Sequence, residues 1–274
     1  MTNPATQVAV ITGAANGLGK ALAFALHRRG YHLALIDIDR AGLELLLTAL
    51  PPAAAVVSLH PTDVAQEAEV AQACADILRR HGRVDLLINN AGISISHPFA
   101  GLPAADFQRL MAVNFWGTVH CTRAFLPALL ERPSSHLINI ISGFAVSGFP
   151  GKTAYGASKG AILAFSNALQ IELQGSSLRL SVVIPPPMPT AIVRRGLHHS
   201  AAGQAREDLF LQNRGWAPER VAERLLRQAL AGRYRIVIGR LMWGMDLAAR
   251  IFPSLTQRLL GRYKDRLDFK QVLL

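Results

Sequence analysis

The feature that most constrains the fold of this chain is a glycine-rich loop between an apolar run and a helical pattern near the N-terminus. Residues 8–12 read VAVIT, which predicts a short buried strand. Gly13, Gly17 and Gly19 follow, and a helical pattern covers residues 20–29. Glycines in a strand–loop–helix joint permit a tight turn and let phosphate groups approach the backbone at the helix N-terminus. The joint therefore favours an α/β fold that binds a dinucleotide.

Strand and helix patterns alternate along the rest of the chain. Further strands are expected at residues 33–36, 55–59, 84–88, 137–141, 178–184 and 235–238, and helices at 66–81, 103–131 and 154–174. No internal repeat or low-complexity linker interrupts them. Strands that alternate with helices form parallel sheets covered on both faces. The sequence predicts one domain over residues 1–274, a Rossmann-like doubly wound parallel β-sheet of about seven strands with a C-terminal helical extension.

The end of the second expected strand carries a carboxylate, Asp37. A carboxylate at this position can accept both hydroxyls of an adenosine ribose and would repel a 2′-phosphate. Arg40, three residues later, favours the phosphate instead. Asp37 could also cap the next helix, although Asp39 suits that role better. The expected cofactor is NAD, with NADP as the less favoured alternative.

Residues 142–159 hold the side chains best suited to chemistry. Ser142 follows an expected strand, and Tyr155 and Lys159 lie four residues apart in the first turns of a helix, so they share one face. A phenol has an ordinary pKa of about 10, and lowering it by about 3 units costs about 4 kcal/mol. An ammonium about 4 Å away contributes that much at an effective dielectric of about 20. A surface Tyr/Lys pair on an ordinary helix is the alternative for these two residues taken alone.

Taken together, these motifs resemble the short-chain dehydrogenase/reductases, which are single-domain NAD(P)-dependent oxidoreductases. The likeness covers residues 7–240 and consists of Thr12-Gly13-x-x-x-Gly17-x-Gly19, Asp63, Asn89-Asn90-Ala91-Gly92, Asn114, Ser142 and Tyr155-x-x-x-Lys159, in the family's order. The 13-residue step from Ser142 to Tyr155 also matches the family's spacing.

The resemblance implies roles for the matched residues. Tyr155 would be the general acid/base, Ser142 would orient the substrate oxygen, and Lys159 would hold the nicotinamide ribose. Asn114 would distort its helix and hold a water that joins Lys159 to a proton relay. Asp63 would contact the adenine amino group, with Val64 beside the ring. The implied cofactor-binding set is Thr12, Gly13, Asn16, Gly17, Leu18, Gly19, Asp37, Asp63, Val64, Asn90, Ala91, Gly92, Tyr155, Lys159, Pro185 and Thr190.

Two positions depart from the family pattern. After the strand at residues 178–184 the family has Pro-Gly, but here Pro185 is followed by Pro186. Proline has no backbone N–H, so no contact through that amide is possible. Gly143 stands where many relatives carry a second serine, which leaves Ser142 as the sole hydroxyl at that strand end.

The expected substrate pocket is apolar. The expected substrate contacts are Ile93, Phe144, Phe149 and Met188, and further candidates for the lining are Ile95, His97, Val146 and Ile192. This lining predicts a hydrophobic secondary alcohol or ketone. By resemblance, residues 191–215 form a mobile lid. Arg194 and Arg195 in this lid could meet an acidic group, although a solvated face is the favoured interpretation.

The basic charge is concentrated near the C-terminus. The net charge is +11, and residues 191–274 hold 16 Lys/Arg against 7 Asp/Glu. The apolar run in the extension at 241–274 is interrupted by Asp246 and Arg250, well short of the ~20 residues of a membrane span. This extension packs over the pocket or a neighbouring subunit, or else lies on an anionic lipid surface. Nucleic-acid binding is not expected, because no recognised motif accompanies the charge.

Other features set the wider expectations. Cys74 and Cys121 fall in expected helices as small apolar residues, and no secretion signal is seen, so we expect a cytoplasmic protein. No His, Cys or carboxylate side chains have metal-ligand spacing, so we expect no metal. By resemblance, the helices at 103–131 and 154–174 pair across a two-fold axis in a homodimer or homotetramer. Three functions stay open: an NAD-dependent alcohol dehydrogenase, an NADPH-dependent carbonyl reductase, and a catalytically idle nucleotide-binding or membrane-associated scaffold.

Overall fold

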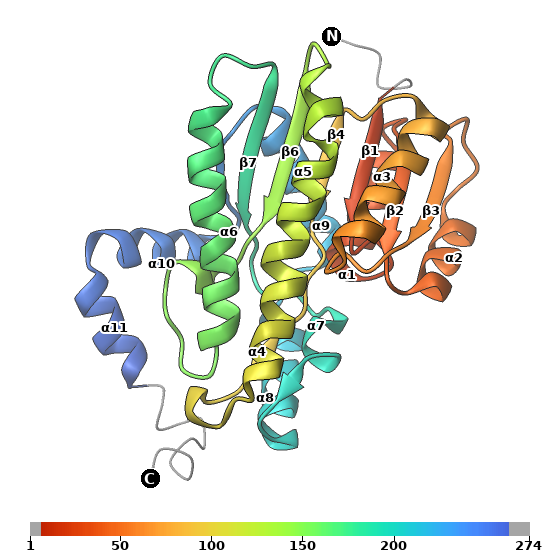
Figure 1. Ribbon diagram of the computed structural model, residues 1–274. Helices are drawn as coiled ribbons and strands as arrows, with labels where there is room; N and C mark the ends of the chain where they lie inside the picture. The colour runs from red at the N-terminus through yellow and green to blue at the C-terminus, as the bar shows by residue number, and fades with distance from the viewer. Residues whose placement is uncertain (1–6, 263–274) are drawn as a thin grey trace.

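The computed structural model describes residues 7–262, and these form a parallel sheet of seven strands covered by helices on both faces (Figure 1). The strands are β1 (Val8–Thr12), β2 (His32–Asp37), β3 (Val57–Pro61), β4 (Leu86–Asn89), β6 (Ser135–Ile140), β7 (Leu178–Ile184) and β9 (Arg235–Val237). They are arranged in the order β3-β2-β1-β4-β6-β7-β9. The chain first adds strands on one side of β1 and then, from β4 onward, on the other side. Ligands bind at this change of strand order in folds of this kind. The expected fold class is confirmed.

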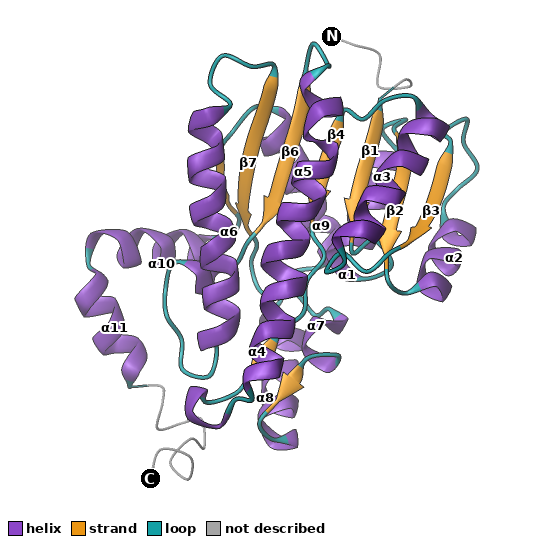
Figure 2. Cartoon of the chain, in the orientation of Figure 1, coloured by secondary structure: helices purple, strands orange, loops and turns teal. Residues whose placement is uncertain are grey.

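The helices include those that cover the two faces of the sheet, those of the segment at 191–215 and those of the C-terminal extension. They are α1 (Gly17–His27), α2 (Arg40–Ala49), α3 (Glu67–His81), α4 (Ala104–Met111), α5 (Gly117–Leu130), α6 (Thr153–Glu172), α7 (Ala191–Arg194), α8 (Ala201–Arg214), α9 (Pro218–Leu230), α10 (Arg240–Ile251) and α11 (Pro253–Gly261). One buried core joins α1, α2 and α9 to the sheet, and the other joins α3, α5 and α6 to its opposite face (Figure 2). Every residue of β1 is buried, as its continuous apolar run predicts.

The third strand lies two residues later than the sequence indicated, at Val57–Pro61 instead of 55–59. It forms one edge of the sheet, where half-exposed positions weaken the hydrophobic signal. An edge strand also tolerates Pro61, because a residue without an N–H interrupts no interior hydrogen-bond ladder there.

The expected helix at 103–131 is divided by a π-helical turn at Ala112–Trp116. Single π turns widen a helix locally and are frequent at functional sites. This one surrounds Asn114, so the helix distortion that we expected at this residue is present.

The expected lid at 191–215 is a compact unit made of α7, β8 (Leu197–His198) and α8. Strand β8 pairs in parallel with β5 (Ile95–Ser96), a two-residue strand that precedes a short 3₁₀ turn at Phe99–Gly101. Strands this short leave no periodic pattern in a sequence, which is why neither was expected.

The C-terminal extension consists of α10 and α11, which project from the body beside α6 (Figure 1). Residues 263–274 of the expected extension lie outside the described residues. No helix within residues 7–262 is long and apolar enough to cross a membrane.

Candidate active site

The glycine loop after β1 packs closely against the start of α1 and leaves its backbone accessible to a ligand. Gly13 has a φ of +65°, and a Cβ on Gly19 would lie 2.0 Å from the Gly13 carbonyl oxygen. The Asn90 side chain donates to the carbonyl oxygens of Thr12 and Gly13, at 2.9 and 3.1 Å. The Thr12 hydroxyl accepts the N–H groups of Asn90 and Ala91, both at 3.0 Å. The loop is thereby fixed to the end of β4 with its backbone open, which fits the pyrophosphate of a dinucleotide.

Asp37 lies beside this loop. One carboxylate oxygen accepts the Ala15 N–H at 2.9 Å, and the other accepts the Asp39 N–H at 3.0 Å. Helix α2 is capped instead by Asp39, which accepts the Gly42 N–H at 2.9 Å. Asp37 is thus held at the strand end, where a ribose can reach it.

The remaining residues of the expected cofactor set lie at the same edge of the sheet. Asp63 accepts the Ala65 N–H at 3.0 Å, and Val64 is buried against Gly117 of α5. Thr190 lies against Gly17, so the segment after β7 meets the glycine loop. The contacts of these side chains with a cofactor stay predictions.

Asn114 joins the π turn to both the β4 loop and α6. It is fully buried, accepts the Ile93 N–H at 2.8 Å and donates to the Ile93 carbonyl and the Ser158 hydroxyl, both at 3.0 Å. Ser158 in turn donates to the Tyr155 carbonyl at 2.8 Å. Ser158 was not expected as a site residue, since a serine in a helix gives no signal of its own. The proton-relay role of Asn114 stays a prediction.

Lys159 is buried beneath Tyr155, one turn further along α6. Its ammonium donates to the Ile140 carbonyl at 3.0 Å, at the end of β6. Burial lowers the pKa of Lys159 from 10.5 to about 8. At neutral pH the side chain is still mostly protonated and keeps a positive charge behind the phenol.

The pKa of Tyr155 differs from the sequence-based expectation. Burial raises it from 10.0 to about 12, although the hydrogen bond with Ser142 lowers it and the charge of Glu207 raises it. We expected Lys159 to lower this pKa, but its ammonium is directed to the Ile140 carbonyl. Removal of the phenol from water outweighs the single hydrogen bond. A phenolate at this site therefore needs an additional positive charge nearby.

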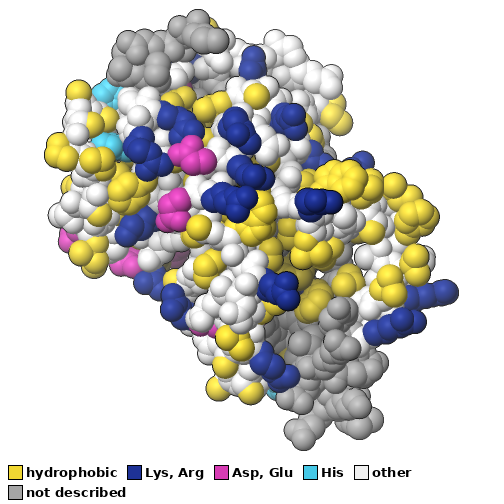
Figure 3. Space-filling model, turned by 180° about the vertical axis from the view of Figure 1, so that it is seen from behind, with side chains coloured by type: hydrophobic (Ala, Val, Ile, Leu, Met, Phe, Trp, Pro, Cys, Tyr) yellow, Lys and Arg dark blue, Asp and Glu magenta, His cyan; other side chains and the backbone are white. Residues whose placement is uncertain are grey.

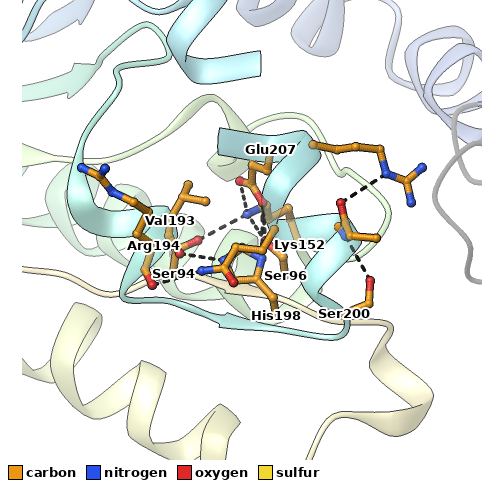
Figure 4. A network of polar contacts seen from close by, with 12 residues as sticks. Ser94, Ser96, Lys152, Val193, Arg194, His198, Ser200 and Glu207 are labelled. Carbon is orange, nitrogen blue, oxygen red and sulfur yellow. Dashed lines mark hydrogen bonds and ion pairs between the residues drawn. The ribbon is translucent and has the colours of Figure 1, made fainter. Parts of the chain in front are cut away.

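A buried polar network connects the start of α6 to the lid (Figure 4). The Lys152 ammonium donates to Glu207 of α8 at 2.6 Å, to Ser94 at 3.3 Å, and also to Ser96. Ser96 donates to the other Glu207 oxygen at 2.7 Å. His198 lies beside Glu207, with 3.9 Å between its Nδ1 and the carboxylate. The network joins the start of α6, the two-stranded sheet of β5 and β8, and helix α8.

The pKa values of Lys152 and Glu207 reflect both their burial and their ion pair. Burial lowers the pKa of Lys152, although the Glu207 carboxylate opposes the shift. For Glu207, burial raises the pKa, but the charge and hydrogen bond of Lys152 outweigh it and hold the pKa below its ordinary value. The Lys152 ammonium also lies 5.9 Å from the ring centres of Phe144 and Tyr155. Sequence reasoning missed this pair, because its members are far apart in the chain.

Three of the four expected substrate contacts surround Tyr155. Phe144 packs edge-on against Tyr155, with ring centres 6.2 Å apart, and against Phe149 at 5.5 Å. Ile93 packs with Tyr155 in a further apolar cluster. Met188 packs instead against the core on the α1 and α9 face.

Gly143 lies against α10. A Cβ at this position would lie 2.8 Å from the terminal methyl of Met242, the far end of a flexible side chain, so a serine there would require this methyl to shift. Elsewhere in residues 7–262, no group of three or more His, Cys, Asp or Glu side chains is arranged to hold a metal ion.

Comparisons with known proteins agree with this geometry. The family model described as short chain dehydrogenase matches residues 7–200. A protein of Mycobacterium tuberculosis named "Putative oxidoreductase SadH" is 34% identical over 260 residues, covering 93% of this chain and 94% of its own. A short-chain dehydrogenase/reductase from Burkholderia phymatum, solved in complex with NAD, has a TM-score of 0.84 at 27% identity and covers 94% of this chain and 97% of its own. An alcohol dehydrogenase from Thermococcus sibiricus, complexed with 5-hydroxy-NADP, has a TM-score of 0.73 at 26% identity and covers 85% of this chain and 95% of its own.

Proposed function

Because the chain belongs to the short-chain dehydrogenase/reductase family of NAD(P)-binding oxidoreductases, we propose that it interconverts a hydrophobic secondary alcohol and its ketone. The observation that carries this proposal is the arrangement of Ser142, Tyr155 and Lys159 at the end of β6, beneath a cluster of apolar side chains. The chemistry of this arrangement is proton transfer at an oxygen bound to carbon.

The chain has the groups that a dinucleotide needs. The glycine loop after β1 would hold the pyrophosphate, Asp37 the adenosine ribose and Lys159 the nicotinamide ribose. When bound, the nicotinamide supplies or accepts the hydride, and in its oxidised form it carries a positive charge. A positive charge close to Tyr155 favours the phenolate, which the burial of this side chain alone disfavours.

The protein's own part in the reaction is to position and move one proton. In the oxidation direction, the Tyr155 phenolate removes the proton of the substrate hydroxyl as the carbonyl bond forms. In the reduction direction, the neutral phenol donates that proton to the developing alkoxide. Ser142 donates a hydrogen bond to the same oxygen, and the Lys159 ammonium stabilises the phenolate electrostatically.

NAD is the proposed cofactor, with NADP as the alternative. A 2′-phosphate next to the Asp37 carboxylate would be repelled, whereas Arg40 at the start of α2 would favour it. Solved relatives are bound to cofactors of both kinds. Calorimetric titration with NADH and NADPH tests the preference. Equal or tighter NADPH binding would contradict the role of Asp37 and indicate Arg40.

The lid role of residues 191–215 also belongs to this proposal. Helix α8 places Glu207 on Lys152, the N-cap residue of α6, three residues before Tyr155. Closing the lid in this way would remove water from the apolar surface around Phe144 and strengthen the electrostatic interactions at the phenol.

The decisive experiment is a screen of hydrophobic secondary alcohols with both cofactors, using wild-type protein and Tyr155→Phe. Turnover of the variant should fall by about 10²- to 10⁴-fold, the usual effect of losing one positioned acid/base, while cofactor affinity stays nearly unchanged. A Tyr155→Phe protein that keeps most of its activity would contradict this mechanism. Cofactor binding without turnover of any alcohol or ketone would favour a nucleotide-binding scaffold instead.

We propose a homodimer or homotetramer built on α5 and α6. Trp116, Leu130 and Ile171 are exposed apolar side chains in this helix layer. Light scattering should give at least twice the mass of the chain at micromolar concentration. A monomer would contradict this arrangement.

A further inference from the structure

Helices α10 and α11 form a projection at one edge of the sheet (Figure 1). The inner side of α10 is anchored, because Met242 is buried against Gly143 and Asp246 is buried in an ion pair with Arg235. Helix α11 packs on α10 and has no buried residue. Within residues 7–262, the pair is therefore attached to the body on one side and exposed on the other.

The uncovered side is apolar. Trp243 is 60% exposed, Phe252 is 59% exposed and Leu255 is 54% exposed. Leu241, Leu247, Ile251 and Leu259 are also exposed, and a groove of about 400 Å³ runs between the two helices. Hydrophobic side chains gather over this projection in Figure 3. Monomeric proteins rarely expose so many large apolar side chains together, and such a surface is typical of a site that binds a partner.

The charges of this surface are positive. Arg240, Arg250, Arg258 and Arg262 are all exposed on the two helices. The one acidic residue within 239–262 is Asp246, which is buried and paired. In Figure 3, dark blue side chains lie at the margins of the apolar region. The partner must therefore combine an apolar interior with a negatively charged surface.

We propose that the α10–α11 surface docks on an anionic lipid bilayer. Trp, Phe and Leu beside arginines are typical of helices that lie in the membrane interface. Both helices are far too short to span a bilayer, so they would lie in its plane. A second copy seated symmetrically on the same surface would bring arginines against arginines without exposed acids to pair with them.

The anchored side of α10, opposite the docking surface, lies next to Ser142. Met242 of α10 contacts Gly143, the residue directly after Ser142. Docking would hold this end of the sheet at the lipid surface, where hydrophobic alcohols and ketones accumulate. Membrane docking itself does not depend on the reaction, whereas this consequence rests on the proposed function.

Vesicle sedimentation tests the proposal. Wild-type protein should bind phosphatidylcholine vesicles that contain about a third phosphatidylglycerol, and should bind pure phosphatidylcholine much more weakly. Replacing Arg240 and Arg258 with Gln should weaken binding by about 30-fold, since each basic residue near an anionic surface contributes roughly a fivefold factor. Trp243→Ser with Phe252→Ser should lower binding to both kinds of vesicle by at least about 10-fold, because the buried apolar area is lost.

Matched controls lie at the opposite edge of the sheet. Leu45→Ser on α2 removes an equally exposed apolar side chain, and Arg80→Gln on α3 removes an arginine, and neither should change vesicle binding. Unchanged binding in the α10–α11 variants, or no binding by the wild type, would overturn the proposal. A drop in oligomeric mass for Trp243→Ser/Phe252→Ser would overturn it in favour of a second copy. NADH titration of the same variants reports separately on the proposed function.

Discussion

Two buried lysines lie seven residues apart, at the start of α6 and two turns into it, and they have opposite surroundings. Lys159 faces the sheet, where, among the residues that the structure describes, its ammonium contacts the Ile140 carbonyl and pairs with no carboxylate. Lys152 faces the lid, where Glu207, Ser94 and Ser96 surround its ammonium. Burial lowers the pKa of both, but only Lys152 has a carboxylate that opposes the shift.

The presence or absence of a carboxylate partner indicates what a buried ammonium is used for. An uncompensated ammonium costs stability, and a protein retains one where its charge serves chemistry. A compensated ammonium joins two segments, and its cost appears only when one partner is removed. We therefore propose that the charge of Lys159 serves the reaction, and that Lys152 holds the segment at 191–215 against the start of α6. The predictions below test this distinction, from the largest expected effect to the smallest.

Removing one member of the lid pair should be strongly destabilising. Lys152→Met or Glu207→Gln should each lower the free energy of unfolding by about 3 kcal/mol, the lower end of the range for buried pairs, because part of Glu207 reaches solvent. Lys152→Met with Glu207→Leu should recover much of this loss, since no unpaired charge remains. Urea denaturation measures all three. Losses that simply add in the double variant would show that the pair does not act as a unit.

The control for that cycle is Arg195→Gln, which breaks the exposed ion pair between the lid and Asp39. Exposed ion pairs contribute less than about 1 kcal/mol, so this variant should be almost as stable as the wild type.

Lys159→Met should raise the free energy of unfolding, in contrast to Lys152→Met and Glu207→Gln, which should lower it. A pKa that falls from 10.5 to about 8 corresponds to a cost of up to about 3 kcal/mol at neutral pH, partly offset by the hydrogen bond to Ile140. Between pH 8 and 10.5 the unfolded chain binds more protons at Lys159 than the native one, so this residue's contribution to stability rises with pH there. The advantage of the variant should be largest below pH 8 and should vanish near pH 10.5.

Denaturation of wild type and variant across that pH window is the measurement. A stability difference that does not change with pH would indicate that the pKa of Lys159 is not lowered in the native protein. Turnover and cofactor affinity should both be lost, because this lysine acts on the phenol and on the ribose.

The pKa of Tyr155 provides a smaller, spectroscopic test. In the protein without cofactor, burial should keep this phenol neutral at pH 10, where an ordinary tyrosine is half ionised. The phenolate absorbance of wild type minus Tyr155→Phe should therefore be close to zero at that pH. Oxidised cofactor should increase it, and Glu207→Gln should increase it slightly, because a negative charge is removed. A half-ionised Tyr155 at pH 10 without cofactor would contradict the raised pKa.

The smallest effect concerns kinetics. Glu207→Gln should raise KM by a few-fold and leave kcat nearly unchanged, because the lid contributes to binding while Tyr155 and Lys159 are intact. A fall in kcat as large as that of Lys159→Met would place Glu207 in the chemical step and remove the distinction between the two lysines.

The sequence was sufficient for the parts of this protein that depend on local patterns. Gly13, Gly17 and Gly19 follow a buried strand, and Tyr155 and Lys159 have the spacing of one helical turn, so neighbours in the chain specify both arrangements. The alternation of apolar strands and helices likewise determined the parallel sheet.

Only the tertiary structure determined which distant side chains contact one another and how deeply they are buried. Glu207 reaches Lys152 from 55 positions away, and Asn114 reaches Ser158 from 44 positions away. No periodicity in the sequence records such a pairing. The direction of the Tyr155 pKa shift was also outside the reach of the sequence, because spacing gives the distance to Lys159 but not the loss of water around the phenol. Local order is encoded between near neighbours, whereas burial and charge pairing depend on segments that only the folded chain brings together.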